Sequence, residues 1–342
     1  MGTGGETYPS IMCRIPQFTS LSVLTGAPDA PHPMFVVDDI PYPELMFSKY
    51  QNVVVNGRAY SLPAQDPRVY ITFDEAKTAC ETKGRGWHLA TNAEYAGIAL
   101  WCKQNGFMPR GNNYYGGDYT ARHEQGSVCY TYNDGGTIRK GRTLTGSGPV
   151  SWNHDGSPAG ICDLNGNVWE RAGGGRLKNG EIQVIPHNNA AKHIDQSDTS
   201  VQWKAILPDG SFVAPGTANT LKYDSVSAGT VGQVGAIQLN TVISNSNAPA
   251  SGDDGYIYNT FETLTAKSGV NVPIILKMLG LFPVDASHGG DGLWVRNYGE
   301  RLPLRGGSWN NGSGAGVFAL SVHVSRAHSS HYVGFRAAFV NL

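Results

Sequence analysis

The chain has 342 residues, of which 15% are charged, and its 26 Lys and Arg against 27 Asp and Glu leave a net charge of -1. This length is enough for one large domain or two ordinary ones, so a disulfide-stapled miniprotein is excluded. With 44 Gly and 19 Pro, the composition favours turns and loops and argues against a helical bundle. The sequence has no basic block, which argues against a nucleic-acid partner.

The chain also lacks the usual marks of membrane insertion and export. Its first twenty residues have no basic start followed by an apolar run, and no stretch reaches the roughly 18 apolar residues that span a bilayer. We therefore expect no membrane insertion and a cytoplasmic location before any assembly. The five cysteines are widely spaced and form no CxxC pair, so we expect buried or incidental thiols. They are Cys13, Cys80, Cys102, Cys129 and Cys162.

Residues 1–34 contain five prolines among Ser, Thr and Gly, and this composition predicts an extended N-terminal arm or linker. The main domain is expected to span residues 35–342. It opens with β-rich runs, and Asn56-Gly57 between two of them predicts a two-residue hairpin.

Two capped helices follow the hairpin. Thr72 precedes Glu75 by three residues, and Thr91 precedes Glu94 in the same way, which is the spacing of a capping box. Glycines after each apolar run predict the helix ends. Beyond them, glycine recurs every few residues up to position 148, so regular structure should be sparse. Residues 180–290 alternate β-favourable runs with turn residues and are interpreted as a β-rich insertion.

Three segments carry the most information: GICDLNGNVWE at 160–170, RLPLRGGSWNNGSGAGVFAL at 301–320 and VGFRAAF at 333–339. In the first, a tight turn precedes a short strand whose Trp fills a core. Glu170 follows that Trp, and a buried carboxylate needs a cation or donors, so we expect it to contact Arg305 or Arg336.

In this order, GNVWE, RGGSW and GFR resemble the C-type-lectin-like fold of the formylglycine-generating-enzyme superfamily over about residues 35–342. WHLATNAEY resembles the family's Leu-Pro-Thr-x-x-Glu-Trp segment, with Ala90 and Tyr95 at the Pro and Trp positions. The resemblance implies an α+β fold with two main helices, short strands, much irregular loop and the β-rich insertion. It also implies that the two termini share a sheet and that five aromatic side chains are buried, namely Trp169, Trp309, Phe318, Phe335 and Phe339.

Within this superfamily, the C-terminal region at about 305–339 resembles the variable proteins of diversity-generating retroelements, which include tropism determinants of bacteriophages. Replacing adenines in Asn codons yields Ser, His, Tyr, Gly, Asp or Thr codons, and residues 321–332 are rich in Ser, His and Tyr. Such side chains suit a recognition surface because they supply amphipathic area and adaptable hydrogen bonds. An ordinary polar loop is the plainer alternative.

The resemblance implies a ligand-binding protein that displays a diversified surface on a rigid scaffold, with the scaffold near 35–310 and 333–340 and a binding face drawn from 308–332. The ligand would be a protein or glycan receptor on a cell surface, and the protein would lie on a virion, as in a phage tail, or on a cell surface. A homo-oligomer is possible. We expect the ligand-binding residues to be solvent-exposed on one face: Ser308, Asn310, Asn311, Gly314, Ser321, His323, Val324, Ala327, His328, Ser330, His331 and Tyr332.

Two alternatives are an enzyme of the same superfamily with unassigned chemistry and a purely structural virion or surface protein. The oxygen-dependent enzymes of the superfamily use cysteines that follow the RGGS motif, and this chain has none after Cys162. Its iron-dependent enzymes use histidines of an additional N-terminal helical domain, which the 34 Pro-rich residues do not supply. We therefore expect no catalytic residues and no cofactor.

Two groups of residues superficially suggest a metal site. Three histidines fall within 323–331, but no acidic residue or cysteine lies between Glu300 and the C-terminus to complete a ligand set. Asp163, Asn165, Asp253 and Asp254 offer oxygens for calcium, but their spacing matches no EF-hand. We therefore assign no metal.

Overall fold

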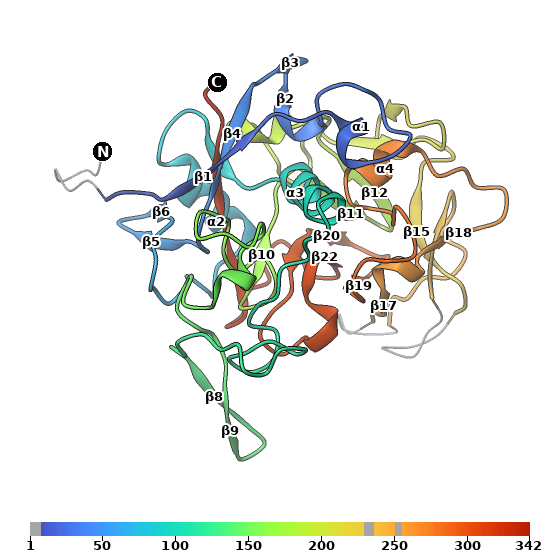
Figure 1. Ribbon diagram of the computed structural model, residues 1–342. Helices are drawn as coiled ribbons and strands as arrows, with labels where there is room; N and C mark the ends of the chain where they lie inside the picture. Colours follow the sequence, from blue (N-terminus) through green and yellow to red (C-terminus); the bar gives the residue numbers. More distant parts are fainter. Residues whose placement is uncertain (1–7, 229–235, 250–254) are drawn as a thin grey trace.

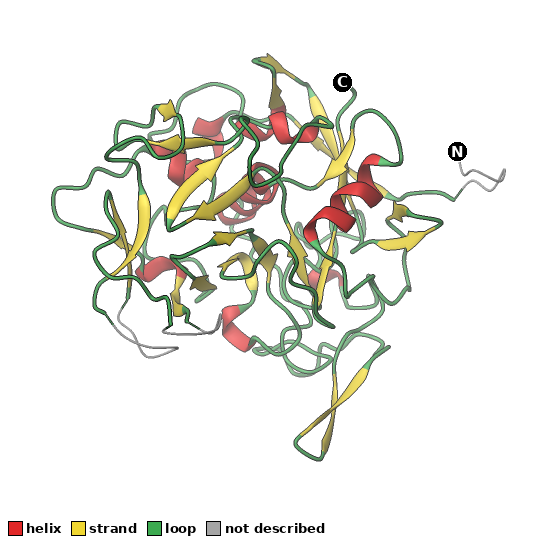
Figure 2. Ribbon diagram, turned by 180° about the vertical axis from the view of Figure 1, so that it is seen from behind, coloured by secondary structure: helices red, strands yellow, loops and turns green. Residues whose placement is uncertain are grey.

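The computed structural model describes residues 8–228, 236–249 and 255–342, in which short strands and loops dominate (Figures 1 and 2). Helices account for 14% of the chain. The expected α+β, C-type-lectin-like fold with two main helices is therefore wrong, because the chain folds chiefly into several sheets joined by glycine-rich loops. The α-helices of the described residues are α1 (Ser20–Val23), α2 (Phe73–Glu81), α3 (Asn92–Gln104) and α4 (Ile274–Met278).

The starts of α2 and α3 are nevertheless where the capping boxes predicted them. The Glu75 backbone N–H donates to Thr72 Oγ1 at 3.3 Å, and Glu75 Oε2 accepts from the Thr72 N–H at 2.8 Å. Thr91 and Glu94 make the same reciprocal pair at 3.2 and 2.9 Å. Each box satisfies two N–H groups that would otherwise lack a partner in the first turn.

As expected, one four-stranded sheet contains both the first and the last strand of the described residues. Its order is β1 (Met12–Pro16), β4 (Glu44–Ser48), β24 (Ala337–Phe339) and β7 (Trp87–Leu89). From residue 8 onward, the segment expected to be an extended N-terminal arm or linker packs against the rest of the chain. β1 pairs with β4, and α1 and the 3-10 turn η1 (Pro33–Phe35) contribute Val23, Met34 and Phe35 to the core.

A six-stranded sheet gathers the three informative segments. Its order is β17 (Ile257–Thr260), β19 (Gly292–Val295), β22 (Gly316–Val322), β21 (Leu304–Gly306), β10 (Trp169–Arg171) and β23 (Val333–Phe335). β10 runs antiparallel to β21 and parallel to β23, so GNVWE, RGGSW and GFR lie side by side. β22 is buried along its whole length.

The largest sheet is built mostly from residues 175–266. Its order is β14 (Phe212–Val213), β13 (Lys204–Ile206), β12 (Glu181–Val184), β15 (Lys222–Ser225), β16 (Ile237–Asn240) and β18 (Thr265–Ala266), and β11 (Gly175–Lys178) and β20 (Glu300–Arg301) extend it from β12. Pairing of β20 with β11 ties this region to the chain just before the RGGSW segment.

Three two-stranded hairpins complete the fold. β5 (Val53–Val55) and β6 (Arg58–Tyr60) flank Asn56 and Gly57, whose φ angles of 50° and 74° are the left-handed values that a type I′ turn requires. This confirms the predicted hairpin. β2 (Val36–Val37) pairs with β3 (Ile40–Pro41). β8 (Thr131–Asp134) and β9 (Thr137–Lys140) form a hairpin that projects from the body of the molecule (Figure 1).

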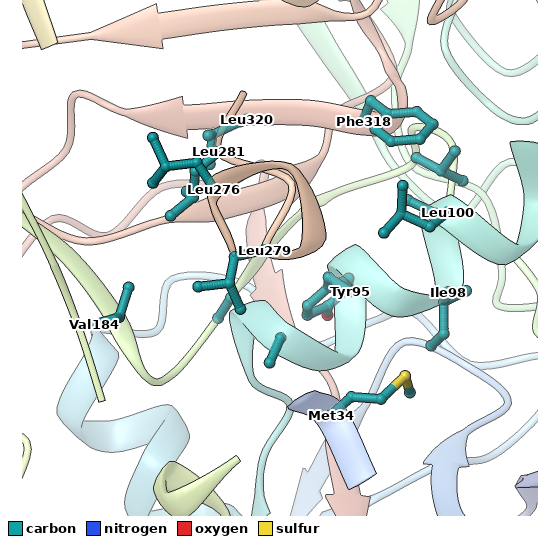
Figure 3. Packing of buried hydrophobic residues seen from close by; sticks show 14 of the residues in the cluster. Met34, Tyr95, Ile98, Leu100, Val184, Leu276, Leu279, Leu281, Phe318 and Leu320 are labelled. Atoms are coloured by element: carbon teal, nitrogen blue, oxygen red, sulfur yellow. The ribbon is translucent and has the colours of Figure 1, made fainter. Parts of the chain in front are cut away.

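The main core surrounds α3, whose buried residues include Tyr95, Ile98 and Leu100 (Figure 3). Met34 lies on one side of this helix, and Phe318 of β22 lies on the other (Figure 3). Of the five aromatic residues expected to be buried, Trp169, Trp309, Phe318 and Phe335 are buried and confirm the expectation. Phe339 is half-buried, so the expectation that it is buried is wrong. It lies near the end of the chain, where its ring contacts Trp87 at 5.2 Å.

A buried ion pair links the six-stranded and four-stranded sheets. The Arg336 Nε donates to Glu170 Oε2 at 2.7 Å, and both side chains are almost fully buried. Gln51 Nε2 donates to Glu170 Oε1 at 2.8 Å, and the Tyr95 hydroxyl completes the shell at Oε2. Arg305, the other expected partner, instead binds Asn92 Oδ1 at 2.6 Å. The partner of Glu170 is therefore Arg336.

Candidate ligand-binding face

The segment expected to vary, 308–332, runs through the centre of the six-stranded sheet and then leaves it. It begins after β21, passes the 3-10 turn η5 (Gly312–Gly314), forms β22 and ends in the loop 323–332 before β23. Only two of the twelve predicted binding residues are fully exposed, Asn310 and Ala327. Five are half-buried: Asn311, His323, His328, His331 and Tyr332. Five are buried: Ser308, Gly314, Ser321, Val324 and Ser330.

The expected exposure is therefore wrong for the five buried residues, and their contacts give the reason. Ser321 lies in β22 between two neighbouring strands, and its hydroxyl contacts His323 Nδ1 at 2.6 Å. Val324 packs with Trp169, Leu304 and Val333 in a small apolar cluster.

A local turn buries Ser308, and contacts with distant segments bury Gly314 and Ser330. The Ser308 hydroxyl contacts Asn310 Oδ1 at 3.0 Å and Asn311 Oδ1 at 2.9 Å, so it closes the turn after RGG. A Cβ on Gly314 would meet Trp294 at 3.2 Å. Ser330 is buried where its carbonyl accepts the Tyr70 N–H at 3.0 Å.

The loop 323–332 is held mainly through its backbone carbonyls. The carbonyl of Val324 accepts the Leu302 N–H at 3.1 Å, and the carbonyl of Tyr332 accepts the Trp169 N–H at 2.8 Å. The carbonyl of Arg326 accepts the Phe73 N–H at 3.2 Å, which fixes the loop to the start of α2.

Two buried arginines hold the middle of the same loop. Arg142 Nη1 donates to the His331 carbonyl at 2.8 Å, and Arg171 Nη2 donates to the His328 carbonyl. Arg142 is itself fixed by Asp66, through Nε to Oδ1 at 2.7 Å and Nη2 to Oδ2 at 2.9 Å. Because a guanidinium in a fixed geometry is a rigid donor, these contacts define the path of the loop backbone.

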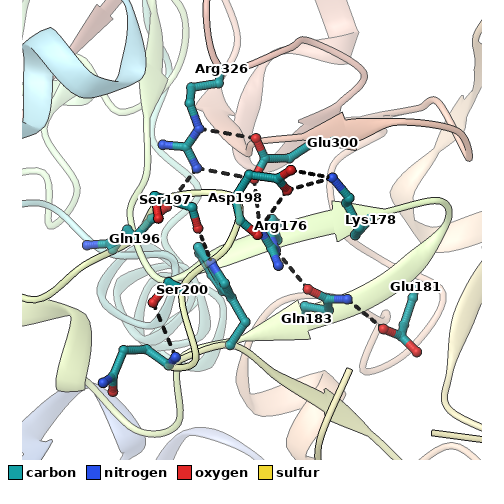
Figure 4. A network of polar contacts seen from close by, with 12 residues as sticks. Arg176, Lys178, Glu181, Gln183, Gln196, Ser197, Asp198, Ser200, Glu300 and Arg326 are labelled. Carbon is teal, nitrogen blue, oxygen red and sulfur yellow. Dashed lines mark hydrogen bonds and ion pairs between the residues drawn. The ribbon is translucent and has the colours of Figure 1, made fainter. Parts of the chain in front are cut away.

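Arg326 is the one loop side chain that joins an extensive ion-pair network (Figure 4). Its guanidinium contacts Asp74 of α2 at 2.8 Å and Glu300 of β20 at 3.1 Å, and it donates to the Gln196 carbonyl at 2.6 Å. Glu300 also pairs with Arg176 at 2.8 Å, so the loop is tied to the largest sheet. Arg326 is not among the residues expected to vary, and its contacts fit a fixed position.

Aromatic rings gather around His331. Its ring centroid lies 5.5 Å from that of Trp309, 6.0 Å from Tyr130, 6.3 Å from Tyr132 and 5.0 Å from Tyr332. Trp309 is buried beneath this group. We call the outer side chains, Tyr70, Tyr130, Tyr132, His331 and Tyr332, the aromatic face. Tyr70 is 59% exposed, and its ring lies 6.3 Å from that of His331.

The aromatic face presents an uncharged imidazole. Partial burial lowers the pKa of His331, and the nearby Arg142 charge lowers it further. Arg142 lies against the Tyr130 ring, with its guanidinium carbon 4.2 Å from the centroid. Tyrosine and neutral histidine together offer apolar area with hydrogen-bonding edges, which is the composition of many protein and glycan recognition surfaces.

The residues brought together here include some that the sequence did not single out. Tyr70, Tyr130, Tyr132 and Arg142 all lie far from 308–332 in the chain. The stretch 114–132 carries five tyrosines, which is a local concentration that could have indicated a contact surface. Their approach to His331 depends on how the chain folds, which no local pattern shows.

The three clustered histidines do not share one environment. His323 contacts the Tyr256 ring at 5.6 Å, whereas His331 belongs to the aromatic face. Among the residues that the structure describes, no three His, Cys, Asp or Glu side chains are grouped as a metal site would require. Of the four oxygen-bearing residues considered for calcium, Asp253 and Asp254 lie outside the described residues.

The cysteines are all unpaired thiols. Cys13, Cys80, Cys102 and Cys162 are buried, and Cys129 is half-buried. Burial raises the pKa of Cys13 to about 11 and those of Cys102, Cys129 and Cys162 to about 12. Thiols with raised pKa values are poor nucleophiles at neutral pH.

Comparison with known proteins adds no relationship to this geometry: no protein-family model matches the chain, and no curated protein is significantly similar to it. In the described part of the chain, none of the helices combines the length and apolar character needed to cross a bilayer.

Proposed function

We propose that this protein binds a receptor through the aromatic face and the adjoining loop 323–332, and that this loop is a diversified surface like that of the variable proteins of diversity-generating retroelements. The receptor is a protein or glycan on a cell surface, and the protein is carried by a virion, as in a phage tail, or by a cell surface. Its role is recognition and not catalysis.

The main support is the way in which the loop is fixed. Arg142, Arg171 and the backbone N–H groups of Tyr70, Phe73 and Trp169 all bind carbonyl oxygens of the loop. A carbonyl is present whatever the side chain, so residues such as Ala327 and His331 can change without loss of these contacts. A surface that varies its side chains on a constant backbone needs this arrangement.

The stability of variants with substitutions in 308–332 tests this account of the loop. We choose the combined change Asn310→Ser, Ala327→Asn and His331→Asn, since two of these residues are exposed and one is half-buried. The expected loss in the free energy of unfolding is below about 1 kcal/mol. The matched control is Val324→Asn in the same loop, which buries an amide in an apolar cluster and should cost at least about 2 kcal/mol. Equal losses in the two proteins would contradict a backbone-held loop.

The genomic locus tests the proposed diversification directly. We expect a nearby, near-identical repeat of the coding segment for about 305–339 and a reverse-transcriptase gene. Differences between repeat and coding segment should fall at adenines of the repeat and in codons of the seven exposed or half-buried predicted residues, and not in the codons of the five buried ones. Differences scattered over all four bases, or the lack of any repeat, would overturn the proposal.

Self-association would strengthen such binding. Several weak sites on one assembly raise the overall affinity for a multivalent cell surface without any new contact. We therefore propose a homo-oligomer, and light scattering of the full chain measures its mass. A monomer at all concentrations would refute this part and leave the binding face itself untouched.

A further inference from the structure

A groove lies on the projecting hairpin and adjoins the aromatic face, since the Tyr115 N–H donates to the Trp309 carbonyl at 2.7 Å. It has a volume of about 440 Å³ and lies between β9 and the segment 114–125. Two tyrosines, Tyr114 and Tyr115, line it together with Arg122, Arg139 and Lys140. None of its lining residues belongs to 308–332, so the groove side chains can be changed without changing that segment.

The groove has an excess of positive charge. Arg139 pairs with Asp134 at 2.6 Å, so its charge is balanced. No carboxylate of the described residues lies within ion-pair distance of Arg122 or Lys140, and the Lys140 ammonium makes only a 3.3 Å hydrogen bond to Gln125 Oε1. Two cations therefore remain for an anionic group, and no acidic side chain lines the described groove.

The tyrosines hold one of these cations in place. The Arg122 guanidinium lies flat over the Tyr114 ring, with its central carbon 3.4 Å from the centroid. Stacking covers the face of the guanidinium and leaves its N–H edge available, which is the edge that binds a carboxylate through two parallel hydrogen bonds. The Tyr115 ring packs edge-on against Tyr114 at 4.9 Å, and the Arg139 guanidinium carbon lies 5.0 Å from its centroid, so the aromatic surface left to a ligand is the uncovered part of the two rings.

We propose that this groove binds an acidic sugar unit, with the sugar carboxylate at Arg122 and Lys140 and the apolar C–H face of the ring against the tyrosines. A small inorganic anion would use the cations and not the aromatic surface. A neutral sugar would use the tyrosines and leave both cations without a partner. A carboxylated sugar uses both, and the groove volume lies in the range of ordinary small-ligand sites.

The test uses the full chain and isothermal titration with trigalacturonate and sialyllactose as probes. The methyl ester of trigalacturonate keeps the sugars and removes the charge, whereas tricarballylate keeps three carboxylates and removes the sugars. We expect at least one of the two acidic saccharides to bind, at least about tenfold more tightly than the methyl ester and tricarballylate, because the ester loses the charge-assisted hydrogen bonds and tricarballylate loses the contacts with the tyrosines.

The double change Arg122→Ala and Lys140→Ala should weaken that binding at least about tenfold. Its control, Arg14→Ala with Lys267→Ala, alters the net charge equally at residues outside the groove and should bind as the parent does. Binding of tricarballylate as tight as that of the saccharides would show an anion site and overturn the proposal. Failure of both saccharides to bind at concentrations on the order of 10 mM would also overturn it.

One more variant separates this inference from the proposed function. His331→Asn with Tyr332→Asn alters the aromatic face and leaves the groove residues unchanged, so saccharide binding should persist. Loss of saccharide binding in this variant would place the sugar at the aromatic face and refute the groove.

Discussion

Asp163 offers a sharp test of the energetics because its carboxylate is buried and only half satisfied. Oδ2 accepts the Gly146 N–H at 2.8 Å, whereas Oδ1 has no hydrogen-bond partner among the described residues. Burial raises the pKa of this carboxyl from 3.8 to about 6, an effect that the nearby Arg336 only partly offsets. We predict that Asp163→Asn stabilises the protein at neutral pH.

The magnitude follows from the pKa. Because the pKa is higher in the folded state, the ionised form is disfavoured there, and the penalty is complete above about pH 6 and absent below pH 3.8. A shift of about two pKa units corresponds to about 3 kcal/mol. Asn keeps an acceptor for the Gly146 N–H but leaves its own N–H groups without a partner, which costs about 1 kcal/mol. A gain of about 2 kcal/mol at pH 7.5 remains.

Chemical denaturation of both proteins between pH 4 and pH 7.5 measures this gain. Asparagine tolerates the positive φ of 60° at this position, so backbone strain should not offset the effect. As the pH falls to 4 the advantage of the variant should disappear and turn into a deficit of up to about 1 kcal/mol, because only the cost of the unpaired Asn N–H groups remains there. A variant that is less stable than the parent at pH 7.5, or an advantage that does not change with pH, would refute the reasoning.

Three further predictions concern the scaffold. Arg336→Ala should cost about 3–5 kcal/mol of unfolding free energy, because it leaves the Glu170 carboxylate buried and unpaired. Arg336→Lys should not restore the lost stability, because Lys lacks the guanidinium geometry. A melting temperature equal to that of the parent would contradict this prediction. Thr91→Ala should cost about 2 kcal/mol against about 1 kcal/mol for Thr72→Ala, because the Thr91 hydroxyl donates to buried Asn188 at 2.6 Å whereas the Thr72 hydroxyl donates to exposed Glu75. Equal urea midpoints of the two variants would contradict this. Arg171→Ala should increase amide hydrogen exchange in 326–332 at least about tenfold, while exchange in β22 stays unchanged if the arginine acts only on the loop.

Local signals predicted local structure well in this chain. The boxes at Thr72 and Thr91 and the Asn56-Gly57 turn depend on contacts within four residues, and the structure has each of them. The β8–β9 hairpin shows that such a signal can also be missed, because Asp134-Gly135-Gly136 is a typical turn sequence between two β-favourable runs.

The fold class depended on pairings that no local pattern shows. β10 and β23 are parallel neighbours although Trp169 and Val333 are far apart in the chain. Most helices and strands are short, and the balance between helix and sheet was therefore misjudged. Ser321 and Ser330 were expected at the surface because they match positions that vary in the resembling family, yet a central strand position and a carbonyl contact bury them.

The backbone contacts of the loop 323–332 also restrict which genetic changes it can accept. Each carbonyl must reach a particular donor. The Val324 carbonyl accepts from the Leu302 N–H, the His331 carbonyl from the Arg142 guanidinium, and the Tyr332 carbonyl from the Trp169 N–H. Inserting or deleting one residue would move every later carbonyl away from its donor, whereas exchanging one side chain for another moves none. Natural versions of this loop should therefore differ in residue identity and share one length.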